Sequence, residues 1–257
     1  MRINTAKARM LEGKPAIGAI ASLGSPVAAE VLSRAGFDFV LLDCQHGNWE
    51  DQTALLAFRT ICLGPAVPMA RVRQNDFYAI GRLLDRGALG IVVPLVNSAA
   101  EARAAANAVR YPPRGGRSWG PSLADYLGAD YGQRADDEIF LGVQIESAQA
   151  VERAEEILAV DGVDGCWIGP TDLARSMGVD VNTPVGAEAH TAAILRVLEA
   201  CRRTHKIPGI YGDGEANAGR WIEHGFLFVT ATRDARLMTS KAQEVLRVLD
   251  SRPGVET

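Results

Sequence analysis

The chain has 257 residues, of which 47% are hydrophobic, and its 27 Lys and Arg against 31 Asp and Glu give a formal net charge of −4 at pH 7. The acidic balance and the interspersed charges argue against a nucleic-acid or membrane-surface partner. No apolar run approaches the ~20 residues that a membrane-spanning helix requires, and the first residues lack the apolar segment of a signal peptide. We therefore expect a soluble cytoplasmic protein that folds around its own core.

Short apolar runs rich in β-forming residues recur along the chain. They predict eight strands: Ala16–Ala21, Phe39–Asp43, Met69–Val72, Gly90–Pro94, Leu141–Glu146, Gly165–Gly169, Gly209–Gly212 and Phe226–Ala231. The runs are almost continuously apolar rather than alternating, which is typical of parallel strands covered on both faces. The sequence therefore predicts a parallel sheet.

Stretches of helical periodicity separate these runs. They are Val27–Ala35, Thr53–Leu63, Phe77–Arg86, Ala99–Val109, Ala148–Leu158, Ala187–Thr204, Glu215–Glu223 and Arg233–Leu249. Eight βα units in a chain of this length favour an α/β fold, a closed (β/α)8 or TIM barrel, as a single domain over residues 1–257. The alternative is an open doubly wound sheet, which predicts a glycine-rich loop after the first strand, and Ala21–Pro26 is not one.

Two segments fall outside this regular alternation. Residues 111–138 contain two adjacent prolines and two adjacent glycines and exceed the usual length of a loop in a compact domain, so we expect an irregular insertion there. Such loops tend to be functional or to lie at a subunit interface. The final predicted helix, Arg233–Leu249, is long enough to pack on its own barrel or on a neighbouring subunit.

The four cysteines, Cys44, Cys62, Cys166 and Cys201, form no CxxC pair and have no neighbouring histidine at the spacing of a zinc site. A free cysteine among apolar residues behaves as a small core side chain. We expect inert thiols, and although Cys44 lies beside the best motif of the chain, one thiol without a paired base does not indicate a nucleophile.

Barrel enzymes place their active sites at the carboxyl ends of the strands, so polar residues just after each run are candidate site residues. This position selects Asp43, His46, Arg71, Gln144, Glu146, Gly169, Pro170, Thr171 and Asp172. Because these residues follow strands of one barrel, we expect them to converge on one rim.

Glu146 and Asp172 follow adjacent strands and suit a hard divalent cation. Two carboxylates leave several coordination positions free for water and an oxygen-rich substrate, which is how Mg²⁺ is usually held. The alternative is that both residues cap the helices that follow them, since Ser147 and Thr171 also stand where helices begin.

Gly169-Pro170-Thr171-Asp172 also opens a helix, whose free backbone N–H groups form a ready site for a carboxylate. A 2-oxo acid can place its carboxylate there. Gln144 lies two residues before Glu146, on the same face of its strand, and can reach the bound acid. Its alternative is a polar residue inside the barrel.

His46 suits a general base, because the ordinary pKa of histidine lies near 6.5. Asp43, three residues earlier, can orient the imidazole or a water. Arg71 supplies a fixed cation that can stabilise an enolate, and its alternative is an ion pair with Asp76 or Asp85. No lysine follows a strand and no phosphate loop occurs, so we expect neither Schiff-base chemistry nor an organic cofactor.

Four segments of the chain also resemble a known family, and they are Gly36–His46, Arg110–Ser118, Gln144–Glu146 and Asp161–Leu173. They are similar to the class II pyruvate aldolases, the metal-dependent 4-hydroxy-2-oxoheptane-1,7-dioate aldolase family, which also contains the 2-dehydro-3-deoxyglucarate aldolases. The resemblance runs from about Ala16 to Leu237, nearly the whole chain.

The resemblance implies a role for each strand-end residue. Glu146 and Asp172 would hold Mg²⁺, Mn²⁺ or Co²⁺, while His46 would match the base and Arg71 would stabilise the pyruvate enolate. Gln144 and Thr171 would contact the substrate. The aspartate that raises the basicity of the histidine maps to Asp85, although the end of the third predicted helix is expected at the opposite face of the barrel.

The resemblance further implies a homohexamer, for which residues 111–138 and the last helix are the candidate contacts. One departure is Gln45, where members of the family commonly carry Glu before the histidine. The loss of that charge is expected to alter the outer shell of the metal or the aldehyde preference.

The resulting hypothesis is reversible aldol cleavage and addition. A 4-hydroxy-2-oxo acid would give an aldehyde and pyruvate, or a related 2-oxo acid such as hydroxypyruvate, through an enolate. Two alternatives remain at this point. One is a citrate-lyase-like lyase acting on a CoA ester, and the other is a barrel that binds small oxo acids without catalysis.

Overall fold

Eight parallel strands close into one barrel in the order β1 to β8, which confirms the predicted (β/α)8 fold and rules out the open sheet. The computed structural model describes residues 1–250, so the last residues of the predicted domain, 251–257, lie outside the described part. The strands are β1 (Ala16–Ala21), β2 (Phe39–Asp43), β3 (Val67–Arg71), β4 (Gly90–Val93), β5 (Phe140–Ile145), β6 (Gly165–Ile168), β7 (Gly209–Tyr211) and β8 (Phe228–Arg233).

The amino-terminal end of the barrel is filled by aromatic side chains. Phe39, Phe140 and Phe228 are each the first residue of a strand, and the ring of Phe228 lies 4.5 Å from that of Phe39 and 4.9 Å from that of Phe140. Gly18 makes room for this packing, because a Cβ at residue 18 would come within 2.2 Å of the Phe39 ring. The apolar strand starts therefore close one end, and the polar strand ends are gathered at the other.

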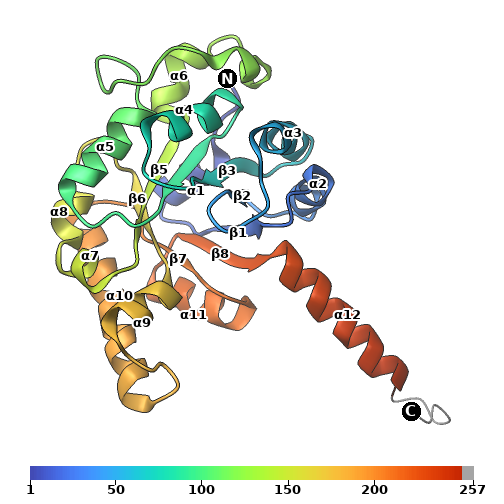
Figure 1. Ribbon diagram of the computed structural model, residues 1–257, viewed down its shortest axis with the longest axis vertical. Helices are drawn as coiled ribbons and strands as arrows, with labels where there is room; N and C mark the ends of the chain where they lie inside the picture. The colour runs from blue at the N-terminus through green and yellow to red at the C-terminus, as the bar shows by residue number, and fades with distance from the viewer. Residues whose placement is uncertain (251–257) are drawn as a thin grey trace.

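Helices surround the barrel (Figure 1). The helices are α1 (Thr5–Leu11), α2 (Pro26–Arg34), α3 (Asp51–Ile61), α4 (Phe77–Asp85), α5 (Ala99–Val109), α6 (Tyr131–Glu138), α7 (Ala148–Glu152), α8 (Ala154–Leu158), α9 (Pro170–Met177), α10 (Pro184–Thr204), α11 (Glu215–His224) and α12 (Asp234–Asp250). Several begin at a side-chain cap that the loop after a strand supplies. The hydroxyl oxygens of Ser25, Ser98 and Ser147 accept the backbone N–H groups of Ala28, Glu101 and Ala150.

The predicted insertion at residues 111–138 is only partly irregular. Two short 3₁₀ turns, Pro121–Leu123 and Asp125–Leu127, are followed by α6, so the expectation is wrong for Tyr131–Glu138. Only Tyr131 and Ala135 of α6 are buried, so its sequence carries little apolar periodicity. The sequence also failed to indicate α1, and the predicted helix Ala148–Leu158 is broken at Arg153 into α7 and α8.

The last helix, α12, projects away from the barrel as a single rod (Figure 1). Asp234 is its only buried residue among those described. Its carboxylate accepts the backbone N–H groups of Ser22 and Leu23 and the hydroxyl of Ser22, which fixes the start of the helix to the end of β1. The rest of α12 is exposed, including Met238 (65%), Val245 (47%) and Leu249 (39%).

Within residues 1–250, none of the helices combines the length and the apolar character needed to cross a bilayer.

Candidate active site

A cavity of about 230 Å³ opens at the carboxyl ends of the strands. Its lining residues are Ile20, Asp43, His46, Arg71, Gln144, Trp167, Gly169, Pro170, Thr171, Asp172, Tyr211 and Arg233. Every residue that the sequence placed on this rim is among them except Glu146, which lies against Gln144 and Gly169. The strand-end residues therefore form one contiguous site.

Asp43 and Arg71 form a buried, two-point ion pair inside this cavity. Arg71 Nε donates to Asp43 Oδ1 at 2.9 Å and Arg71 Nη2 donates to Oδ2 at 2.6 Å. The proposed alternative partners of Arg71 are engaged elsewhere, because Asp76 caps α4 and Asp85 pairs with Arg117. The pair holds the guanidinium in one orientation, and its remaining N–H groups, which have no hydrogen-bond partner among residues 1–250, can meet an oxyanion.

Asp43 contacts both Arg71 and the loop that follows β2. Its carboxylate accepts the backbone N–H groups of Gln45 and His46 at 3.2 Å, and its two oxygens also receive Arg71. Its role in orienting the imidazole or a water stays a prediction. Arg71 and these N–H groups hold the pKa of Asp43 below its usual value against the opposing effect of burial. The His46 side chain is exposed at the cavity and, among residues 1–250, its ring has no hydrogen-bond partner.

Glu146 lies in a tight space behind Gly169. Glu146 Oε1 accepts the backbone N–H of Leu95 at 2.9 Å, and Oε2 accepts Gln144 Nε2. A Cβ at residue 169 would come within 2.7 Å of Glu146 Oε2, so this approach requires glycine. The capping alternative is wrong for Glu146, because Ser147 caps α7. It is also unsupported for Asp172, because α9 begins at Gly169 without a side-chain cap.

The two carboxylates form a suitable environment for a divalent cation. Burial raises the pKa of Glu146 to about 7, and the negative charge of Asp172 adds to this effect. A bound cation would offset both effects, the burial of the ionised Glu146 carboxylate and its repulsion by Asp172. Gln144 also lines the cavity, and its buried Oε1 lacks a hydrogen-bond partner within the described chain. Across residues 1–250 no group of three or more His, Cys, Asp or Glu side chains surrounds a metal position, so water and substrate would complete the coordination of an ion.

The start of α9 forms the wall beside the carboxylates. Pro170 is the first residue of this helix. Its carbonyl oxygen lies 2.8 Å from Nε2 of His190 in α10, and this contact links the helix start to α10. The N–H groups of the first turn have no acceptor within the helix and meet the cavity at Thr171 and Asp172. The carboxylate site that the sequence predicts at this helix start stays a prediction.

Asp85 does not lie in the cavity. It is the last residue of α4, and a helix that follows a barrel strand runs back toward the amino-terminal end of the barrel. Its Oδ1 accepts Arg117 Nη2 at 2.8 Å, and the Arg117 side chain is buried against Tyr111 and Tyr131. Within one subunit Asp85 therefore anchors the insertion, and its catalytic role stays a prediction.

Four residues that line the cavity were not predicted from the sequence: the apolar Ile20 of β1, and Trp167, Tyr211 and Arg233. Trp167 is part of β6, and its ring centroid lies 5.3 Å from Cζ of Arg71. Tyr211 ends β7, and Arg233 ends β8. Arg233 was missed because the eighth strand was predicted to end at Ala231 and the last helix to begin at residue 233. The β-branched Thr230 and Thr232 are the signal that favours a longer strand here.

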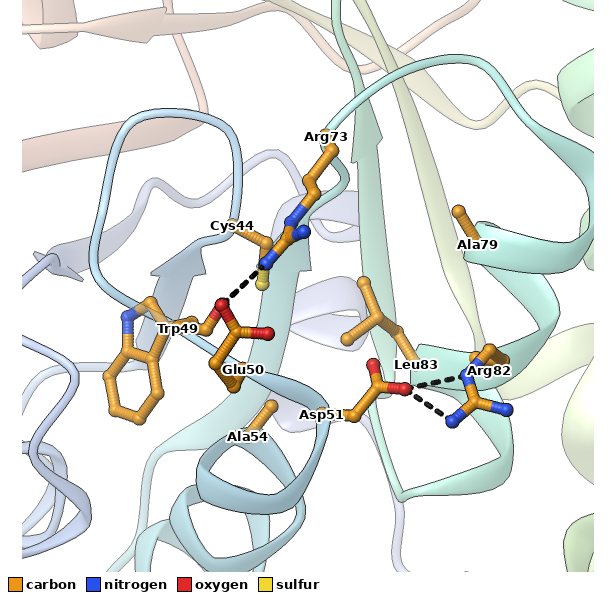
Figure 2. A pocket seen from close by; sticks show the side chains of 9 residues that line it. All are labelled: Cys44, Trp49, Glu50, Asp51, Ala54, Arg73, Ala79, Arg82 and Leu83. Carbon is orange, nitrogen blue, oxygen red and sulfur yellow. Dashed lines mark hydrogen bonds and ion pairs between the residues drawn. The ribbon is translucent and has the colours of Figure 1, made fainter.

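Cys44 lines a different cavity, which lies between α3 and α4 and has a volume of about 220 Å³ (Figure 2). Its thiol lies near Trp49 and Arg73, and the Arg73–Glu50 ion pair spans the opening. Burial raises the pKa of Cys44 to about 12, so it remains a neutral thiol. All four cysteines are free, in agreement with the absence of a predicted disulfide.

The chain was compared with known proteins. Residues 18–240 match the HpcH/HpaI aldolase/citrate lyase family. The chain is 40% identical over 244 residues to the 4-hydroxy-2-oxo-heptane-1,7-dioate aldolase of Escherichia coli, an alignment that covers 93% of this chain and 92% of that relative.

Two solved structures share the fold. One is an HpcH/HpaI aldolase/citrate lyase family protein from Burkholderia cenocepacia J2315, with a TM-score of 0.88 and 29% sequence identity. The match covers 96% of this chain and 100% of that chain. The other is the citrate lyase beta subunit of M. tuberculosis complexed with oxaloacetate and magnesium. It has a TM-score of 0.58 and 16% identity, covering 88% of this chain and 95% of that chain, and it supports the fold alone.

These matches confirm the resemblance that the sequence motifs indicated, and they overturn the alternative of a barrel without catalytic activity. The match extends through all eight strands of the barrel apart from the first residues of β1. The chain therefore belongs to the HpcH/HpaI aldolase/citrate lyase family and is an aldolase, a carbon–carbon lyase.

Proposed function

We propose that the protein catalyses the reversible, divalent-metal-dependent aldol cleavage of 4-hydroxy-2-oxo acids to an aldehyde and pyruvate, or a related 2-oxo acid such as hydroxypyruvate. The observation that carries this proposal is the location of the Arg71–Asp43 pair and Asp172 in one cavity, with Glu146 directly behind Gly169 of its lining. This combination provides a fixed cation for an enolate beside a site for a hard metal ion.

Glu146 and Asp172 are the residues that would hold the ion, for which we propose Mg²⁺, Mn²⁺ or Co²⁺. When bound, such an ion acts as a Lewis acid that withdraws electrons from the keto group and so acidifies the neighbouring carbon. The chain itself would place the 2-oxo acid. Its carboxylate would accept N–H groups at the start of α9, near Thr171, and Gln144 would supply a further polar contact.

The bond-breaking step requires a base and a site for the negative charge. In cleavage, His46, directly or through a water, would accept the proton of the 4-hydroxyl group. The C3–C4 bond would then break, the new C4 carbonyl would leave as the aldehyde, and the electron pair would pass to the pyruvate enolate. The free N–H groups of Arg71 would stabilise the enolate oxygen. Protonation of the enolate carbon completes pyruvate, and aldol addition is the reverse sequence.

We also propose that the protein is a homo-oligomer, a hexamer by its family resemblance, in which α12 contacts a neighbouring subunit. In support, α12 leaves its own barrel (Figure 1) and exposes Met238, Val245 and Leu249, which are spaced seven and four residues apart on one face. An exposed apolar stripe of this kind usually marks a contact surface.

The function is tested by an assay of aldol cleavage. By retro-aldol chemistry, 4-hydroxy-2-oxo-heptane-1,7-dioate yields pyruvate and 4-oxobutanoate. We expect pyruvate release that stops after treatment with a chelator and returns with Mg²⁺ or Mn²⁺. Full activity after chelation would contradict the metal-dependent reaction, and saturable cleavage of an acyl-CoA instead would favour the citrate-lyase-like alternative.

A further inference from the structure

The cavity contains a second arginine that the proposed reaction does not use. Arg233 ends β8 and lines the cavity. Its Nε and Nη2 donate to Tyr211 Oη at 3.1 and 2.8 Å, and that hydroxyl in turn donates to Asp213 Oδ1 at 3.0 Å. The guanidinium is therefore held along one edge by a neutral phenol.

Arg233 and Arg71 differ in how their charge is balanced. Arg71 meets the Asp43 carboxylate at two points, whereas no carboxylate within the described chain forms an ion pair with Arg233. An arginine stays charged at any pH that a folded protein tolerates, and its Nη1 edge is not engaged by Tyr211. The cavity therefore contains a cation in a fixed position with N–H groups that Tyr211 does not engage. A pair of such N–H groups can bind a carboxylate.

Aromatic rings separate the two arginines along one wall of the cavity. Cζ of Arg71 lies 5.3 Å from the Trp167 ring, the Trp167 and Tyr211 rings meet edge to face at 6.2 Å, and Cζ of Arg233 lies 5.2 Å from the Tyr211 ring. These contacts order the wall from β3 through β6 and β7 to β8.

The order of this wall determines which part of a substrate meets Arg233. The metal ligands and the start of α9 follow β5 and β6, so the 2-oxo acid lies at that side, with Arg71 at its enolate oxygen. Arg233 ends β8, which β7 separates from β6, so it lies beside Tyr211 and away from the metal ligands, and the charge of Asp43 also acts on it. A substrate that extends from the reacting carbon along the wall brings its aldehyde half to Arg233.

We infer that Arg233 determines the aldehyde specificity of the enzyme by binding a carboxylate on the aldehyde half, with Tyr211 as its positioning residue. The inference rests on the proposed function and adds to it the residue that would select 4-hydroxy-2-oxo acids with a second, distal carboxylate. Neutral aldehydes of the same length lack the group that Arg233 recognises.

The test compares two aldehydes of similar length as acceptors for pyruvate, 4-oxobutanoate and pentanal. For Arg233→Gln we expect kcat/KM with 4-oxobutanoate to fall about 10- to 100-fold, the usual range for the loss of a hydrogen-bonded charge, while pentanal changes by less than about twofold. Arg233→Lys should recover part of the loss. Tyr211→Phe should raise KM for 4-oxobutanoate with little change in kcat.

Arg175→Gln is the matched control, because it removes an exposed arginine of α9 that does not line the cavity. It should leave both aldehydes unaffected. Deuterium exchange of the pyruvate methyl group, measured without aldehyde, should also be unchanged in Arg233→Gln.

An equal effect of Arg233→Gln on both aldehydes, or none on either, would overturn the inference. A matching loss of methyl exchange would overturn it as well, since Arg233 would then serve the 2-oxo acid. Absence of exchange in the wild-type enzyme loaded with Mg²⁺ would be a different failure, because it would contradict the proposed function on which the inference depends.

Discussion

Asp43 and Arg71 are register partners, the last residues of two neighbouring parallel strands, and their side chains join in a two-point ion pair above that register. The pairing of β2 with β3 therefore places the guanidinium before any substrate arrives. Both side chains are buried, so removing either charged group would leave the other charge buried without a partner.

Substitution of Arg71 is expected to remove the site for the enolate charge. Arg71→Ala should lower the rate of aldol cleavage by about 10²- to 10³-fold, the effect of deleting one donor to a developing oxyanion. Arg71→Lys should restore little, because a single ammonium cannot hold the two-point contact with Asp43. Steady-state kinetics measure both effects, and near-normal kcat in Arg71→Ala would show that the enolate is stabilised elsewhere.

Removal of Asp43 is expected to act mainly on stability. Asp43→Ala would leave Arg71 buried without its partner, which typically costs about 3–5 kcal/mol. Urea unfolding of metal-free protein measures this cost. The double variant Asp43→Ala/Arg71→Ala should be more stable than Asp43→Ala alone. If the two losses simply add, the two residues are not coupled as their geometry indicates.

Glu146 should give the metal-free protein a characteristic pH dependence. Burial raises the pKa of Glu146 to about 7, so between its ordinary pKa of 4.5 and 7 the folded state retains a proton that the unfolded state releases. Stability should therefore fall as the pH rises through this window, by at most about 3 kcal/mol.

The contribution of Glu146 is measured as the difference between wild type and Glu146→Gln. The variant should lack this loss of stability, so its advantage over metal-free wild type should grow from pH 5 to pH 8. Glu152→Gln, which changes an exposed residue of α7, is the control. Mg²⁺ should bind the wild type more weakly below pH 7, because protons compete for Glu146. A pH-independent affinity would contradict its role as a ligand.

A side chain at residue 169 is expected to displace Glu146. A Cβ at this residue would come within 2.7 Å of Glu146 Oε2 and 2.8 Å of Gln144 Nε2, so Gly169→Ala must displace Glu146. We expect metal affinity measured by calorimetry to fall at least about tenfold with the fold retained. Gly81→Ala is the matched control, because a Cβ there has open space in the middle of α4. It should stabilise the protein by about 0.5–1 kcal/mol. Unchanged affinity in Gly169→Ala would mean that Glu146 does not hold the metal.

The exposed stripe of α12 provides a test of assembly. Met238→Glu/Val245→Glu places two charges on that stripe and should convert the oligomer to smaller species in light scattering after size-exclusion chromatography. Gln243→Glu adds a charge on another face of the same helix and should leave the mass unchanged. A wild-type monomer, or an intact oligomer in the double variant, would contradict the role of α12.

The sequence predicted the barrel and most of its site because both depend on local patterns. Continuous apolar runs ending in Asp43, Arg71 and Glu146 identify strands and the rim at which they end. The sequence did not predict the contacts that these residues make with one another. The partner of Arg71 depends on the register between β2 and β3, which no spacing along the chain reveals.

Errors arose where a pattern was weak or a boundary uncertain. The predicted eighth strand ends two residues before β8 does, so Arg233 was assigned to a helix and was not recognised as a site residue. The burial of Glu146 depends on Gly169 and on the backbone of Leu95, which approach it from other loops. Such tertiary contacts raise its pKa, and the sequence alone gives no measure of them.

The most direct test of the central claim is proton exchange at the methyl group of pyruvate in deuterated water, followed by proton NMR. It reports enolate formation without any aldehyde. We predict rapid loss of the methyl signal with Mg²⁺- or Mn²⁺-loaded wild type, none with chelator-treated protein, and a loss of exchange of about 10²-fold or more in Arg71→Ala. Exchange that persists after complete metal removal, or that proceeds normally without Arg71, would contradict the account.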